Sequence, residues 1–94
     1  MPSSNLADYY VYILQSLKAD DIYIGFSTDL RARMRKHRSE HRDWRLIYYE
    51  AYASAKDARR RERRLKQHGS GKVELKKRLQ HSLKLVSQIG AGSQ

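Results

Sequence analysis

The stretch YYVYILQSLKADDIYIGF, residues 9–26, decides the fold of this chain. Its two ends, Tyr9–Ser16 and Ile22–Phe26, are short runs rich in aromatic and β-branched residues, which favour β-strands. The five residues between them, Leu17–Asp21, have the composition of a turn. The sequence therefore predicts a β-hairpin on which the rest of the fold is built.

A basic helix is expected directly after the hairpin. Ser27 or Thr28 is a suitable N-cap, and Asp29 in the first turn places a negative charge at the positive end of the helix dipole. This helix should run to about Glu40, where the next residues break the pattern.

The apolar stripe of this helix contains two unexpected residues. Leu30 and Met34 define the stripe, and Arg33 and His37 fall on the same side at helical spacing. A guanidinium and an imidazole turned toward the interior of a small protein are therefore candidate functional groups.

The remainder of the chain predicts one more strand and two more helices. Trp44–Tyr52 forms the strand, Ser54 with Asp57 opens a helix that ends near Gln67, and a further helix covers about Val73–Val86. The order ββαβαα indicates an α+β domain with a three-stranded, largely antiparallel sheet flanked by helices.

The composition excludes several classes of protein. We expect one domain, residues 9–86, between flexible ends at 1–8 and 87–94. No apolar run is long enough to cross a membrane, and no secretory signal opens the chain. The absence of cysteine removes disulfides, thiolate catalysis and cysteine–zinc sites, and the expected location is the cytoplasm.

Charge is unevenly distributed along the chain. Residues 1–30 carry a net charge of −3 and residues 31–94 a net charge of +13, for +10 in total. This asymmetry favours a polyanionic partner, most simply nucleic acid. A solubilising surface or a polybasic patch facing a membrane would also explain the excess, but arginine dominates and aromatic residues lie nearby, which favours nucleic acid.

Two further segments, the second helix and the hairpin, contain residues that break the expected pattern. Glu62 lies within the apolar stripe of the second helix, among basic neighbours. Tyr12 and Tyr23 lie on facing strands of the hairpin, and Gly25 leaves a surface that another backbone can approach closely. We expect these side chains to meet Arg33 and His37 at one face of the sheet.

Such a set of side chains is suited to the cleavage of a phosphodiester. A carboxylate can hold Mg²⁺, an arginine can bind a phosphate with two parallel hydrogen bonds, and a histidine or tyrosine can relay the proton of an attacking water. The basic surroundings are expected to lower the pKa of a tyrosine and make it a better base. Each residue taken singly also has an ordinary structural explanation, so composition and periodicity leave the choice open.

The ordered set resembles the GIY-YIG nuclease domain. Tyr23-Ile24-Gly25 matches its YIG element, and Tyr10-Val11-Tyr12 stands where Gly-Ile-Tyr is expected, so that only the tyrosine is kept. Arg33 follows Tyr23 by ten positions, His37 follows four later, and Glu62 lies where the family has its metal-binding glutamate. The resemblance covers about residues 9–80 and is strongest to small standalone members of the family.

The resemblance implies a metal-dependent endonuclease that uses Mg²⁺ or Mn²⁺ to hydrolyse DNA, with single-stranded DNA the first substrate to test. It implies that Tyr12 assists in activating water and that Tyr23 and His37 support proton transfer and phosphate contact. Arg33 would stabilise the transition state, and Glu62 would hold the metal. Contacts to the nucleic-acid backbone are expected from Gly25, Arg31, Arg35, Lys36, Arg59, Arg63 and Lys72.

One departure from the family pattern affects the expected activity. Many catalytic members carry an asparagine after the glutamate, and the only asparagine of this chain is Asn5. A non-catalytic nucleic-acid-binding module on a nuclease fold is therefore the alternative hypothesis. A basic protein that docks on an acidic protein or an anionic lipid is a third hypothesis, which nothing in the helices favours. The sequence does not indicate an oligomeric state.

Overall fold

The computed structural model describes residues 8–18, 21–40, 42–67 and 70–85, so the expected flexible ends lie outside the described residues except for Asp8. No helix in these ranges is long and apolar enough to span a membrane. The elements are β1 (Tyr9–Ser16), β2 (Ile22–Ser27), α1 (Leu30–Glu40), β3 (Trp44–Tyr52), α2 (Ala55–Lys66) and α3 (Ser70–Arg78).

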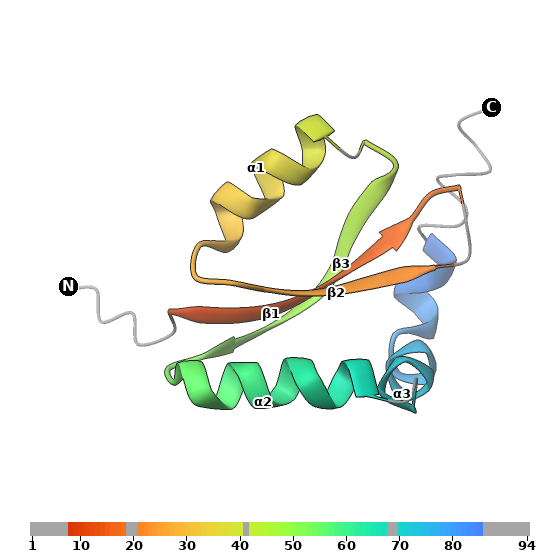
Figure 1. The fold of residues 1–94 in the computed structure, drawn as a ribbon. Helices are drawn as coiled ribbons and strands as arrows, with labels where there is room; N and C mark the ends of the chain where they lie inside the picture. The colour runs from red at the N-terminus through yellow and green to blue at the C-terminus, as the bar shows by residue number, and fades with distance from the viewer. Residues whose placement is uncertain (1–7, 19–20, 41, 68–69, 86–94) are drawn as a thin grey trace.

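The three strands form one antiparallel sheet in the order β2-β1-β3, so the hairpin pairs as predicted and β2 is an edge strand. Helix α1 lies over one face of this sheet, and α2 lies along the opposite face with α3 at its end (Figure 1). The predicted α+β class and the order ββαβαα are confirmed.

The start of α1 differs from the prediction by one or two residues. The Asp29 carboxylate accepts a hydrogen bond from the Ala32 amide at 3.0 Å, so Asp29 is the N-cap. The Ser27 hydroxyl accepts from the Asp29 amide at 3.0 Å and fixes the turn before the helix. A carboxylate is a better acceptor for exposed amides at a helix N-terminus than a hydroxyl, because it is charged.

Helix α2 begins as the sequence predicts, whereas the third predicted helix is divided in two. Ser54 caps α2 as predicted, since its hydroxyl accepts from the Asp57 amide at 3.3 Å. The third predicted helix is divided: α3 ends at Arg78, and residues 80–85 are helical after a turn.

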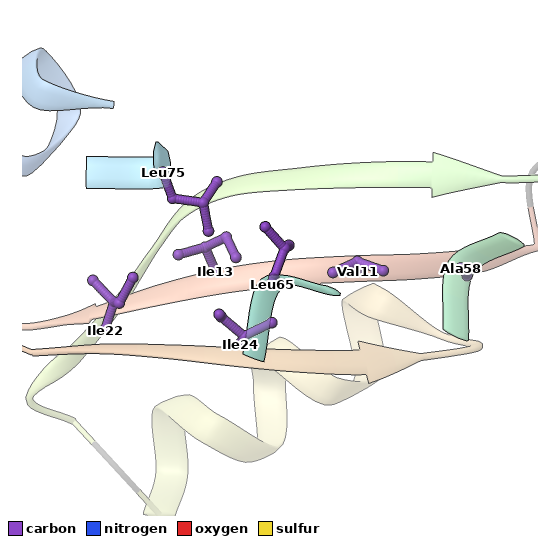
Figure 2. Close-up of a cluster of buried hydrophobic side chains, with 7 residues drawn as sticks. All are labelled: Val11, Ile13, Ile22, Ile24, Ala58, Leu65 and Leu75. Atoms are coloured by element: carbon purple, nitrogen blue, oxygen red, sulfur yellow. The ribbon is translucent and has the colours of Figure 1, made fainter. Parts of the chain in front are cut away.

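The core lies between the sheet and α2. Val11 and Ile13 of β1 and Ile22 and Ile24 of β2 alternate onto this face, and three helical side chains meet them, namely Ala58, Leu65 and Leu75 (Figure 2). Alternation along the strands places Tyr12 and Tyr23 on the other face, toward α1.

A β-bulge interrupts the pairing of β1 with β3. Ile13 pairs with Tyr48, but Leu14 pairs with Leu46, so Ile47 is an extra residue in β3. Side chains alternate along a strand, and one extra residue therefore exchanges the two faces. The bulge thus turns Leu46 and Trp44 toward α1, whereas an unbroken strand would turn them toward α2.

A polar cluster joins β3 to α2. The Arg61 guanidinium donates to both carboxylate oxygens of Glu50, at 2.9 and 3.1 Å, and the hydroxyls of Tyr48 and Tyr52 donate to the same carboxylate. Burial by itself would raise the pKa of Glu50, but these hydrogen bonds outweigh it and lower the pKa below the ordinary value of 4.5. The ionised cluster therefore stabilises the fold.

We predict that Glu50→Gln lowers the free energy of unfolding by about 2 kcal/mol near neutral pH, because it leaves the Arg61 guanidinium poorly paired. Folding lowers the pKa of Glu50, so the wild-type advantage is present above the ordinary carboxyl range and is lost as the pH falls through the folded-state pKa. Urea denaturation at several pH values measures this. Glu40→Gln, at the exposed end of α1, is the control, and an equal loss in both variants would contradict the prediction.

Candidate active site

The phenol of Tyr12 lies over Gly25. Tyr12 is in the central strand and Gly25 is its direct partner in the edge strand. A Cβ atom built on Gly25 would come within 2.8 Å of Tyr12 Cε1 and closer still to Cζ and the hydroxyl oxygen. The missing side chain of Gly25 therefore lets the Tyr12 ring cross β2 and bring its hydroxyl to the edge of the sheet.

Tyr12, Tyr23 and His37 form a compact cluster on the α1 face. The Tyr12 ring centroid lies 6.1 Å from that of Tyr23 and 5.9 Å from that of His37, and the Tyr23 and His37 rings are also 5.9 Å apart. The Tyr12 hydroxyl and His37 Nε2 form a long hydrogen bond of 3.4 Å. Tyr12 is fully buried, whereas Tyr23 is 45% exposed, so a ligand can reach the cluster from the Tyr23 side.

Helix α1 half-buries His37 in the cluster and keeps Arg33 exposed. His37 is half-buried, as its place on the apolar stripe predicts, but the Arg33 side chain is exposed, which corrects the expected inward direction. A long arginine side chain reaches water readily while its stem follows the helix. The Arg33 charge still acts on the cluster, because it opposes the rise in the pKa of Tyr12 that burial causes.

The expectation that basic surroundings lower the tyrosine pKa is wrong for Tyr12. Burial is the largest effect and, with the neighbouring Tyr23, it raises the pKa of Tyr12 to about 12 against the opposing charge of Arg33. The phenol is accordingly protonated at neutral pH. Tyr12 can donate a hydrogen bond and pass a proton on, but it is not a phenolate base.

Glu62 does not lie on the same face of the sheet as the tyrosines, which corrects the expected arrangement. It belongs to α2, whose Ala58 and Leu65 pack on the opposite face, because the apolar stripe that contains Glu62 is the one that covers the core. Its carboxylate is held by two cations of its own helix, Arg59 at 3.6 Å and Lys66 at 3.0 Å.

Glu62 nevertheless acts on the Tyr12 hydroxyl across the edge strand. Its charge makes a small contribution, after burial and Tyr23, to the raised pKa of Tyr12. Its neighbour Arg59 stacks on the ring of Phe26, 3.8 Å from the centroid, and Phe26 follows Gly25 in β2. Tyr12 thus reaches the edge at Gly25 from one face, and the helix that carries Glu62 contacts the same edge strand from the other (Figure 1).

Glu62 is the only member of the candidate set that can serve as an oxygen ligand for a hard cation. Its side chain is 13% exposed, and its two carboxylate oxygens face Arg59 and Lys66. Within the described ranges, no group of three or more His, Cys, Asp or Glu side chains could hold a metal ion. Mg²⁺ is commonly bound through one or two carboxylates, several waters and the substrate phosphate, so a single carboxylate fits this ion.

The residues expected to contact the nucleic-acid backbone are distributed over both faces of the sheet. Those on helices belong to three different helices, and the structure does not bring them together into one patch. Gly25 is buried, Lys72 is half-buried, and the exposed side chains are those of Arg31, Arg35, Lys36, Arg59 and Arg63.

Sequence reasoning missed a hollow next to the cluster. Trp44 lines it together with Leu14, Tyr23 and His37. Trp44 faces this side only because of the bulge at Ile47, and nothing in the alternation of β3 signals that bulge. In the sequence, only the aromatic and basic residues around Trp44 point to a binding surface there.

The match to a protein family agrees with this geometry. The model of the GIY-YIG catalytic domain matches residues 8–78, so the chain belongs to the GIY-YIG family. This family consists of endonucleases, which places the chain among nucleases at the level of the family, with nucleic acid as the class of substrate. Comparisons with curated proteins and with solved structures gave no match.

We predict that Gly25→Ala lowers the free energy of unfolding by about 1–3 kcal/mol, because the added methyl group displaces the Tyr12 ring. In a Tyr12→Ala background the same substitution should cost little, since the displaced ring is gone. Urea denaturation of the four proteins gives the coupling between the two positions. An equal cost of Gly25→Ala in both backgrounds would show that the ring does not lie over the glycine.

Proposed function

We propose that this protein is a metal-dependent endonuclease that hydrolyses phosphodiester bonds of DNA, with single-stranded DNA as its preferred substrate. The observation that carries the proposal is the cluster of Tyr12, Tyr23 and His37 at the edge strand, in a chain of the GIY-YIG family. Two phenols and an imidazole, approached from the exposed Tyr23 side, supply the groups that proton transfer to and from a phosphodiester requires.

Tyr12 and His37 form a path for the proton of the attacking water. In the His37 tautomer that carries its proton on Nδ1, the Tyr12 O–H can donate to Nε2 over the observed 3.4 Å, and the Tyr12 oxygen can accept a hydrogen bond from the water. Transfer of the water proton to Tyr12, with transfer of the Tyr12 proton to His37, leaves a hydroxide nucleophile and an imidazolium. Tyr12 is unchanged overall, which agrees with its high pKa.

Arg33 and Tyr23 are placed to hold the substrate. The exposed guanidinium of Arg33 can swing toward the cluster and bind two non-bridging oxygens of the phosphate, where negative charge increases during the reaction. The Tyr23 hydroxyl, on the open side of the cluster, can donate to the same phosphate. Both groups are hydrogen-bond donors and can therefore bind an anion.

Glu62 is the residue that would hold Mg²⁺ or Mn²⁺. When bound, a divalent cation supplies a positive charge that stabilises the leaving oxygen. The Lys66 side chain, which is 49% exposed, can leave the Glu62 carboxylate and remain solvated.

We predict that Glu62→Gln abolishes cleavage of labelled DNA while binding is retained. The amide keeps the shape of the side chain but loses the charge that binds the cation. Gel assays with single-stranded and duplex DNA, with Mg²⁺ or Mn²⁺ and with or without chelator, measure cutting, and fluorescence anisotropy measures binding. Glu74→Gln, at an exposed position of α3, is the matched control.

The same assay separates the endonuclease from the alternative function. Metal-dependent cutting that is lost in Glu62→Gln and kept in Glu74→Gln supports the enzyme. Binding without cutting under every condition would instead support a non-catalytic nucleic-acid-binding module. If duplex DNA is cut faster than single-stranded DNA, the proposed preference for single strands is wrong but the endonuclease function stands.

A further inference from the structure

A hollow of about 250 Å³ opens beside the tyrosine–histidine cluster. Its walls are Leu14, Tyr23, His37 and Trp44, which are an aliphatic side chain and three rings. Two of these residues, Tyr23 and His37, also belong to the candidate active site. A group bound in the hollow therefore lies directly next to the phosphate that the active site would bind.

The bulge in β3 is what places Trp44 in this wall. After the extra residue Ile47, Trp44 pairs with Ser16 and faces α1, on the same side as Leu14. Bulges that lie next to functional sites commonly re-aim a side chain in this way. The start of β3 is also held in place, because the Arg45 guanidinium donates to the backbone carbonyls of Arg42 and Trp44 at 2.8 and 3.2 Å.

The surroundings of the hollow are positively charged. A larger hollow of about 620 Å³ shares Leu14, His37 and Trp44 with it and is also lined by Arg38 and Arg42. The described residues that line the two hollows include no carboxylate. Asp43, next to Trp44 in sequence, forms an ion pair with Lys18 at 3.3 Å, which offsets the nearby negative charge.

We propose that the smaller hollow binds one unpaired nucleobase of the strand that is cut, and that Arg38 and Arg42 bind the phosphates that follow. This inference rests on the proposed endonuclease function. Aromatic walls stack on the face of any base, so the hollow would select for an unpaired base without reading its identity. A base within a duplex is stacked and paired, and would have to leave the helix to enter.

The single tryptophan of the chain makes a direct test possible, because all tryptophan fluorescence comes from Trp44. The wild-type protein, with chelator present to prevent cleavage, is titrated with a short single-stranded oligothymidylate. An oligomer of the same length whose central nucleotides are abasic, and a duplex of the same length, are titrated in parallel. Fluorescence anisotropy of a label on each DNA reports binding independently of Trp44.

The single-stranded oligomer should quench Trp44 fluorescence in step with binding. The abasic oligomer should bind through its phosphates with little quenching, and the duplex should also leave the fluorescence nearly unchanged. Equal quenching by the abasic oligomer or by the duplex would overturn the proposal. Binding of the intact oligomer without quenching, or no binding of any DNA, would overturn it as well.

Substitutions measure what the hollow contributes. Trp44→Ala should weaken binding of the intact oligomer about tenfold and leave binding of the abasic oligomer unchanged, while Trp44→Phe should restore most of the loss. Tyr49→Ala, which removes an exposed ring of β3 that lines neither of these two hollows, is the matched control. An equal loss with both oligomers would mean that Trp44 acts on folding and not on the base.

Failure of this inference and failure of the proposed function are separable. Metal-dependent cutting without selective quenching would leave the endonuclease in place and remove the base-binding hollow. Selective quenching without cutting would retain the hollow and favour a binding module.

Discussion

The structure depends on the packing of one phenol ring over one glycine. Tyr12, in the central strand, passes across Gly25 of the edge strand, where any side chain would collide with it. This contact explains why a tyrosine in one strand and a glycine in the next are needed together. It also delivers a buried hydroxyl to the edge of the sheet, where groups from both faces can approach it.

The position at the edge decides the chemistry that each group can perform. Burial and the neighbouring Tyr23 raise the pKa of Tyr12 to about 12, which suits the proton relay proposed for it and not the role of a base. His37 lies on the same face as the ring, and Glu62 approaches from the helix on the opposite face. The proposed proton path and the candidate metal ligand thus belong to opposite faces of the sheet.

The sequence predicted the class of fold, the hairpin and the cap of α2 because each depends on local patterns of apolar and polar residues. It also predicted that Tyr12, Tyr23 and His37 meet. It placed Glu62 on the wrong face because helical periodicity identifies a buried stripe but not the face of the sheet that the stripe covers. The bulge at Ile47 could not be predicted, because it depends on the register between two strands. The direction of the Tyr12 pKa shift was predicted wrongly, because burial outweighs the surrounding positive charge.

The central claim is that Tyr12 and Glu62 share one site across the edge strand. The most direct measurement is titration with paramagnetic Mn²⁺, with the tyrosine ring signals observed by NMR. Broadening of the Tyr12 and Tyr23 signals before those of the other tyrosines, lost in Glu62→Gln and kept in Glu74→Gln, is the result that this arrangement predicts. Equal broadening in the wild type and in Glu62→Gln would contradict it. So would Mn²⁺ binding at Glu62 that leaves the Tyr12 ring signals sharp.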